Sequence, residues 1–185
     1  MKPLDDGTWP DFAALVERHH GVWGGCWCMA FHAEGVGREK TAEQNRSEKE
    51  LRVREGRAHA ALVYDGADCV GWCQFGPTDE LPRIKHKRAY RDGAGDPPDW
   101  RITCFFVDGE HRRSGVASAA LDGALREIAR LGGGTVESYP QAIEEGARVS
   151  SSFLHNATVS LFERHGFART RRLGKHHWVV SRVVG

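Results

Sequence analysis

The sequence predicts an α+β fold in which helices flank a mixed, mostly antiparallel sheet containing one parallel pair of strands. Two observations carry this prediction. Two apolar runs, residues 58–64 and 69–75, are separated by an Asp-Gly-Ala-Asp turn, which is typical of an antiparallel hairpin. A near-continuous apolar strand (101–108), an amphipathic helix (116–131) and a short strand (135–140) then form a parallel crossover unit.

The segment before the hairpin is predicted to form two helices of different character. Residues 9–20 place three apolar side chains on one side with helical spacing. Residues 38–57 hold seven basic and five acidic residues, and Ser-Glu-Lys-Glu at 47–50 is a capping-box pattern. So much charge predicts a helix face exposed to solvent. Ahead of the first helix, only residues 2–4 can supply a strand.

The segment after the hairpin is predicted to be a long loop, because residues 81–99 are basic at first and then rich in Gly, Pro and Asp. Beyond the crossover, a short helix over 157–165 is closed by Gly166. Two further strands, at 167–172 and 176–184, complete the sheet.

Length and composition indicate one globular domain spanning residues 1–185, with 40% hydrophobic and 28% charged residues. The 26 Lys and Arg residues nearly balance the 25 Asp and Glu residues, so the chain lacks a global basic field for nucleic acid or anionic lipid. No apolar run approaches the length of a membrane span, and the N-terminus lacks the apolar core of a signal peptide. We therefore expect a cytoplasmic protein.

The five cysteines are expected to be free thiols, because a reducing cytoplasm disfavours disulfides. Two pairs of them, Cys26 with Cys28 and Cys69 with Cys73, could together offer four zinc ligands. Their C-x-C and C-x3-C spacings match no familiar zinc pattern, so we expect no metal.

The segment most informative about chemistry joins the strand that ends near Val107 to the helix after it. Gly115 lets the backbone approach a ligand, and the first N–H groups of the helix beyond it have no intrahelical partner. The helix dipole and the side chains of Arg112 and Arg113 add positive charge. The segment predicts a site for phosphate or pyrophosphate; the alternative is a plain helix start with two solvated arginines.

The pattern Arg112-x-x-Gly115-x-Ala117 after a buried strand resembles the acyl-CoA motif of the GCN5-related N-acetyltransferase (GNAT) superfamily. The order of elements is similar over most of the chain, and the Gly-Cys-Trp-Cys-Met segment at 25–29 resembles a bacterial subgroup. The resemblance implies acetyl-CoA as co-substrate, with its pantetheine arm in a V-shaped opening between two splaying strands. The residues that it implies for cofactor binding are Phe106, Val107, Arg112, Arg113, Ser114, Gly115, Val116, Ala117, Ser118 and Asn156.

Catalysis by such a protein needs a base for the amine and an acid for the departing thiolate. The family's usual Tyr acid is replaced here by Phe162, and a Glu found in some relatives is replaced by Arg101. Glu137 and Tyr139 alternate on one face of the strand after the cofactor helix, so we predict that Glu137 is the base and Tyr139 the acid. The alternative is an ordinary buried Tyr and a strand Glu paired with an arginine.

The acceptor side is predicted to include Trp27, Cys28 and Trp72, because aromatic walls suit a partly apolar small molecule. Core packing is an equal alternative for the aromatic segment 23–31. The predicted function is acetyl transfer from acetyl-CoA to a primary amine of a small molecule or an exposed protein amine, by direct attack in a ternary complex. The alternative is a catalytically weak or inactive acyl-CoA sensor of the same fold. The expected partners are a small-molecule amine, no nucleic acid and no membrane, and a homodimer is left open.

Overall fold

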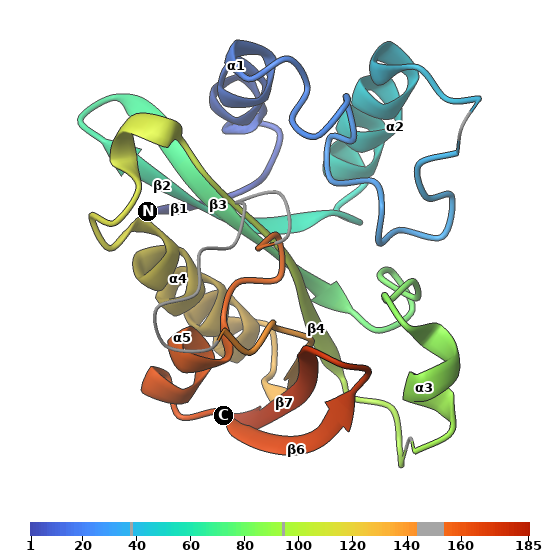
Figure 1. Ribbon diagram of the computed structural model, residues 1–185. Helices are drawn as coiled ribbons and strands as arrows, with labels where there is room; N and C mark the ends of the chain where they lie inside the picture. Colours follow the sequence, from blue (N-terminus) through green and yellow to red (C-terminus); the bar gives the residue numbers. More distant parts are fainter. Residues whose placement is uncertain (38, 94, 144–153) are drawn as a thin grey trace.

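The computed structural model describes residues 1–37, 39–93, 95–143 and 154–185 (Figure 1). The order of strands and helices along the chain is typical of the predicted class. Their bounds are β1 (Lys2–Pro3), α1 (Trp9–Arg18), α2 (Ala42–Arg54), β2 (His59–Asp65), β3 (Asp68–Pro77), α3 (Lys87–Arg91), β4 (Trp100–Val107), the 3-10 turn η1 (Gly109–His111), α4 (Val116–Arg130), β5 (Gly134–Ser138), α5 (Val159–Arg164), β6 (Ala168–Leu173) and β7 (His177–Val184).

The strands of the described residues form one seven-stranded sheet in the order β1-β2-β3-β4-β5-β7-β6. Every neighbouring pair is antiparallel except β4 and β5, which run parallel. The parallel pairing covers only three residue pairs, the last of them Ile102 with Ser138. Beyond that point β4 continues to Val107 without β5 beside it. The predicted α+β sheet with a parallel splay is therefore confirmed.

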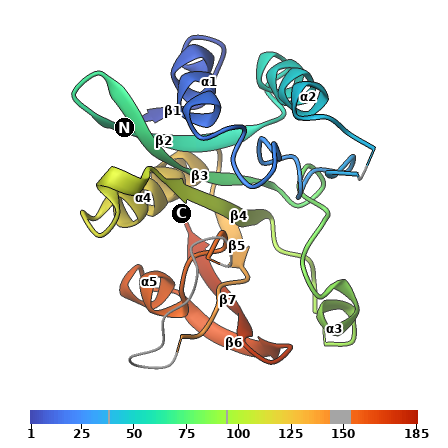
Figure 2. The same cartoon turned by 45° about the horizontal axis from the view of Figure 1, so that its top comes forward.

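The helices cover the two faces of the sheet. Figures 1 and 2 show α1 and α2 on one face and α4 and α5 on the other, with α3 standing beyond the end of the sheet where β4 begins. The core under α4 joins Leu121 and Ile128 to Ile102 and Val136 from the two parallel strands. The core under α1 is aromatic, and its indole and phenyl rings include those of Trp9, Phe12, Trp27, Trp72 and Phe106.

A bulge marks the middle of β4. Gln74 of β3 pairs with Cys104, but the next residue, Phe75, pairs with Ile102. Thr103 is therefore the extra residue of β4, and such a residue bends the strand locally. The bulge lies next to the last parallel pair with β5, so it stands at the point where the two strands part.

The charged helix α2 differs from its prediction in two ways. It begins at Ala42, with a capping box made by Thr41 and Gln44 rather than at residues 47–50. Arg38, the predicted first residue, lies outside the described part of the chain. The predicted solvent-exposed face is also wrong in part, because Lys49 and Arg52 are buried against the rest of the molecule. Tertiary packing determines which residues of the helix are buried, and the density of charge along the sequence does not reveal which helix face packs against the rest of the molecule.

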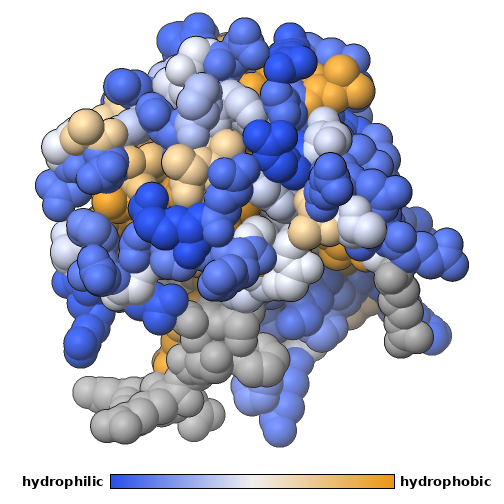
Figure 3. Space-filling view, turned by 90° about the horizontal axis from the view of Figure 1, so that it is seen from above, coloured by the Kyte–Doolittle hydropathy of each residue, from blue (hydrophilic) through white to orange (hydrophobic). Residues whose placement is uncertain are grey.

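The remaining local differences are small. The predicted loop over 81–99 contains the short helix α3, and residues 2–3 do form the edge strand β1. Seen from the side of α1 and α2, Figure 3 shows a mainly hydrophilic surface on which hydrophobic side chains form separate patches. Within the described residues, no helix has the length and apolar character needed to cross a membrane.

Candidate functional site

The turn between β4 and α4 is held to the N-terminal helix by one carboxylate. Asp108 accepts hydrogen bonds from the Glu110 amide (3.2 Å) and from Arg18 (3.2 Å), and one of its oxygens lies 3.1 Å from His19 Nε2. Burial raises the pKa of Asp108, but the bonds from His19, the Glu110 amide and Arg18 outweigh this effect and lower the pKa to about 2. The first residues of the turn are therefore anchored to α1 at neutral pH.

Gly115 is the N-cap of α4 and has a left-handed φ of 88°. A Cβ at this position would meet no atom within 4 Å, so the backbone conformation rather than a lack of space favours glycine. Arg113 is left-handed as well, with φ 65°, and Ser114 between them donates its hydroxyl to the His111 carbonyl. Successive N–H groups in such a turn, together with the first amides of the helix, form a concave site for an anion.

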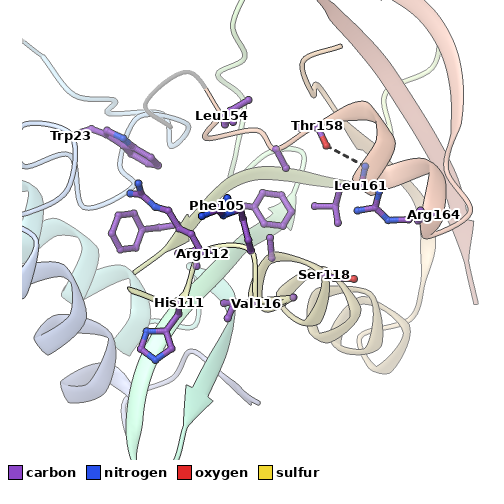
Figure 4. A pocket seen from close by; sticks show the side chains of 16 residues that line it. Trp23, Phe105, His111, Arg112, Val116, Ser118, Leu154, Thr158, Leu161 and Arg164 are labelled. Atoms are coloured by element: carbon purple, nitrogen blue, oxygen red, sulfur yellow. Dashed lines mark hydrogen bonds between the residues drawn. The ribbon is translucent and has the colours of Figure 1, made fainter. Parts of the chain in front are cut away.

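A cavity of about 340 Å³ opens at this turn between β4, α4 and α5. Figure 4 shows Phe105 near its centre, with Arg112 on one side and Leu161 and Arg164 on the other. Eight of the ten residues predicted to bind the cofactor line this cavity: Phe106, Val107, Arg112, Arg113, Gly115, Val116, Ala117 and Ser118.

The other two predicted residues, Ser114 and Asn156, do not line the cavity. Asn156 is buried, and its side-chain amide donates to the Thr103 carbonyl at 2.6 Å. The neighbouring His155 carbonyl accepts from the Phe105 amide at 2.7 Å. The resemblance places the pantetheine arm in the opening beside β4, but in this structure part of that strand edge is paired with residues 155 and 156.

The chemical character of the cavity fits an acyl-CoA. The anion-binding turn and the guanidinium groups of Arg112, Arg113 and Arg164 suit phosphates, while Phe105 and Leu161 give an apolar wall for a pantetheine chain. Sequence reasoning missed Arg164, which lies in the last turn of α5. The available signal was its place two residues before Gly166, the residue that ends this helix.

The two predicted catalytic residues lie together, in a cluster with α3. Tyr139 donates to Glu137 Oε2 at 3.2 Å, and Tyr90 donates to the same oxygen at 2.8 Å. Burial raises the pKa of Tyr139 far above its ordinary value, and the Glu137 carboxylate raises it further. Arg101, the register partner of Glu137 on β4, lies over the Tyr90 ring at 5.6 Å.

This cluster does not line the cavity at the β4–α4 turn. Arg101 and Tyr90 instead line a second cavity, of about 610 Å³, beside α3. Tyr139 is only 1% exposed. Glu137 thus lies one residue pair before the point where the two strands part, and Tyr139 lies one residue beyond that point. A bound thioester would have to reach both groups from the splay.

Several predicted roles near the splay are not supported by the packing. Trp27 and Trp72 are 3% and 1% exposed, and both lie in the aromatic core under α1. Both rings therefore pack in the core and neither offers a surface to an acceptor, whereas Trp23, Cys28 and Phe31 of the same aromatic segment line a cavity. Phe162, at the family's usual acid position, is fully buried between Phe105 and Phe167.

A third cavity, of about 290 Å³, is lined by sulfur. Cys26, Cys28 and Cys104 line it, and the other lining residues include Trp23, which also lines the cavity at the β4–α4 turn. The Sγ atoms of Cys28 and Cys104 lie in contact. Cys26, Cys69 and Cys73 are free thiols, as expected. Among the described residues, no cluster of three or more His, Cys, Asp or Glu is arranged to hold a metal ion.

Comparison with protein families gives one match that covers most of the chain. Residues 25–167 match the model of the acetyltransferase (GNAT) family. No curated protein matches the chain.

Solved structures with similar architecture are numerous. An acetyltransferase of the GNAT family from Desulfovibrio desulfuricans superposes with a TM-score of 0.56 at 17% identity, covering 95% of this chain and 94% of that one. A ribosomal-protein-alanine N-acetyltransferase from Brucella melitensis gives a TM-score of 0.52 at 14% identity, covering 100% of both chains. A histone acetyltransferase HPA2 and related acetyltransferase from Corynebacterium glutamicum gives 0.53 at 14% identity, covering 100% of this chain and 95% of that one. At these identities the likeness concerns the fold alone.

Proposed function

The chain belongs to the acetyltransferase (GNAT) family, and on that premise we propose that it transfers the acetyl group of acetyl-CoA to a primary amine. The acceptor is a small molecule or an exposed protein amine, and the amine attacks the thioester directly in a ternary complex. The observation that carries the proposal is the glycine-capped start of α4, which lines a cavity with two flanking arginines.

Different residues of this chain bind different parts of acetyl-CoA. The amides that come after Gly115 and the guanidinium groups of Arg112 and Arg113 bind the pyrophosphate. Phe105 and Leu161 exclude water from the pantetheine arm. The bound coenzyme supplies an activated acetyl thioester.

Glu137 and Tyr139 supply acid–base catalysis in this proposal. An alkylammonium has a pKa near 10.4 and must lose a proton before it attacks, which is the task of Glu137. Tyr139 keeps its proton at neutral pH, because burial and the neighbouring carboxylate raise its pKa, and it donates that proton to the departing thiolate. Tyr90 fixes the orientation of Glu137 through its hydrogen bond to Oε2.

Replacing Glu137 with Gln or Tyr139 with Phe is expected to lower kcat at least about tenfold, while the affinity for acetyl-CoA stays unchanged. Steady-state kinetics and calorimetric titration of the coenzyme measure the two quantities. Tyr64→Phe is the matched control, since it removes a phenol that donates to Asp11, away from Glu137 and from both cavities, and it is expected to keep wild-type turnover. Wild-type turnover in Glu137→Gln or in Tyr139→Phe would remove that residue from the scheme.

The second candidate function is an acyl-CoA sensor with little or no turnover. Two observations favour it: Phe162 stands at the usual acid position and is fully buried, and Tyr139 is buried as well. Both candidate functions need the same coenzyme site, so they differ only in whether an acetyl group is transferred once the coenzyme is bound.

The two functions are separated by measuring binding and turnover on one preparation. Acetyl-CoA at a hundred times its Kd is expected to add about 2.7 kcal/mol to the stability of the folded protein, which a thermal melt detects. If the protein is an enzyme, adding a suitable amine from a test panel is expected to release one free CoA for each acetylated amine that forms. Chromatography of the coenzyme is the right assay, because thiol reagents also react with the free cysteines of the chain. Stabilisation without amine-dependent CoA release would favour the sensor, and no stabilisation would reject both.

A further inference from the structure

The cavity of about 610 Å³ beside α3 is lined by more positive than negative side chains. It lies between α3, the end of β3 and the beginning of β4. Lys87 and Arg91 of α3 and Arg101 of β4 line it, and the carboxylates of Asp79 and Asp99 line it as well. Among the described residues, the lining therefore carries an excess of one positive charge.

The two carboxylates of this cavity bind backbone amides rather than the cations. Asp99 Oδ2 accepts from the Thr135 amide at 2.7 Å, and Asp79 Oδ1 accepts from the Glu80 amide at 3.0 Å. In the part of the chain that the structure describes, no carboxylate forms an ion pair with any of the three lining cations. The positive charge of the cavity is therefore available to an anion from outside the chain.

Arg101 fixes part of this charge at the inner end of the cavity. Its side chain belongs to a residue only 5% exposed, and Nη1 donates to the Leu81 carbonyl at 2.9 Å. Its Nε has no hydrogen-bond partner among the described residues. A buried guanidinium without a counter-ion is destabilising, so an anion in the adjoining space would stabilise it. Lys87 and Arg91 are exposed and can contact such an anion directly.

The other walls of the cavity suit a hydrocarbon chain. The apolar side chains that line it are those of Pro77, Pro82, Ile84, Tyr90 and Pro98. The prolines and the isoleucine have no side-chain donor or acceptor, so the charged groups dominate polar recognition. A ligand of this cavity therefore combines an anionic group with an apolar chain.

Two residues connect the cavity to the proposed catalytic base. Tyr90 lines the cavity and donates to Glu137 Oε2 at 2.8 Å. Arg101 is the register partner of Glu137 in the parallel pair, so the two side chains project from the same face of the sheet. Glu137 itself is half-buried. One phenol thus separates the cavity from the carboxylate that is proposed to deprotonate the acceptor.

We propose that this cavity binds the acceptor, and that the acceptor is a primary amine that also carries a carboxylate. The carboxylate binds Lys87 and Arg91 and faces the positive charge of Arg101. The hydrocarbon chain lies against the Tyr90 ring, and the amine extends past that ring towards Glu137. A monoanion matches the single excess charge of the lining, whereas a phosphate dianion would exceed it.

The inference rests on the proposed function for acetyl transfer, but the binding of a carboxylate in the cavity does not depend on it. In the transfer, the amine nitrogen forms a bond to the acetyl carbon, and the carbon–sulfur bond of the thioester breaks. The ammonium loses two protons in all. One leaves through Glu137 to solvent, and the other balances the proton that Tyr139 gives to the departing thiolate.

The first test measures binding without turnover. The ligands are 3-aminopropanoate, 4-aminobutanoate and 6-aminohexanoate, each compared with the alkylamine of the same chain length, which lacks only the carboxylate. The rise in melting temperature with ligand concentration gives the affinity of each. At least one amino carboxylate is expected to bind about tenfold more tightly than its alkylamine, and to lose most of this advantage at high salt.

The second test removes the two exposed cations of the cavity. The double variant Lys87→Gln and Arg91→Gln is expected to weaken binding of the amino carboxylate about tenfold, with the affinities for the alkylamine and for acetyl-CoA unchanged. Arg88→Gln is the matched control, because Arg88 is an exposed cation of the same helix that does not line the cavity. All three side chains are exposed, so the variants are expected to fold.

Steady-state kinetics then distinguish this inference from the proposed function. A lower KM for the amino carboxylate than for the alkylamine, lost in the double variant and kept in Arg88→Gln, supports both. Turnover with equal KM values for the two amines would leave the proposed function standing and overturn the inference. Tighter binding of the amino carboxylate without turnover of any amine would support the carboxylate site and reject acetyl transfer. Equal affinity of the double variant and the wild type for every amino carboxylate would overturn the site itself.

Discussion

Gly115→Asp is expected to leave the protein folded and to weaken acetyl-CoA binding about a hundredfold or more. The new carboxylate would stand at the start of α4, where the pyrophosphate is proposed to bind. Two like charges held together without solvent cost several kcal/mol, and about 2.7 kcal/mol already corresponds to a hundredfold change in Kd. A Cβ at this position meets no atom within 4 Å, so the side chain causes no clash inside the fold.

The matched control for this variant is Gly115→Asn. Asn has nearly the same shape as Asp and tolerates the left-handed φ of 88° as well as any residue other than glycine, but it carries no charge. Calorimetric titration of both variants with acetyl-CoA, alongside their melting temperatures without ligand, separates charge from backbone strain. Equal affinities for the Asp and Asn variants would contradict a phosphate site at this helix start.

The part of the site that the sequence predicts is the part made by consecutive residues. The strand, turn and helix from Phe106 to Ser118 are continuous along the chain, so local rules on helix starts and glycine predict the Gly115-capped helix start that the structure shows beside a cavity. Glu137 lies on β5 and Tyr139 directly follows the end of that strand, two residues further on, so extended backbone brings their side chains together as predicted.

The features that the sequence does not reveal all depend on contacts between distant segments. Tyr90 reaches Glu137 from α3, which lies within a stretch whose Gly and Pro content predicts a loop. The contact between Cys28 and Cys104, which are 76 residues apart in the sequence, has no local signal at all. Asn156 occupies a position that the resemblance assigns to the cofactor, yet here it binds the Thr103 carbonyl, because the chain before α5 lies along the edge of β4.

The least predictable feature is a buried cation below the bulge of β4. Lys49 of α2 is 1% exposed, and its ammonium donates to Gln74 Oε1 at 2.9 Å and lies 3.1 Å from His32 Nε2. The Gln74 amide in turn donates to the hydroxyl of Thr103, the extra residue of the bulge, at 3.2 Å. His32 Nδ1 lies 3.2 Å from the Glu80 carbonyl, which leaves Nε2 as an acceptor for Lys49. The chain of hydrogen bonds connects α2 to the strand that carries the cofactor cavity.

The free energy of unfolding is expected to depend on pH because the Lys49 side chain is buried. Burial, and then the nearby Arg52, lower the pKa of Lys49 to about 7, whereas in the unfolded chain it is near its ordinary value of 10.5. Between these values the unfolded state binds more protons than the folded state, so stability rises as the pH rises. The gain attributable to Lys49 is about 1 kcal/mol per pH unit above pH 7.

The measurement is urea unfolding of the wild type and of Lys49→Met at pH 7, 8 and 9. Cysteines and other groups also titrate in this range, but their contributions are shared by both proteins and cancel in the difference between them. That difference is expected to shift in favour of the wild type by about 1 kcal/mol for each pH unit. Lys175→Met, at an exposed position, is the control and should run parallel to the wild type. If the Lys49→Met profile runs parallel as well, the Lys49 side chain does not change its proton affinity on folding, and the predicted lowering of its pKa is wrong.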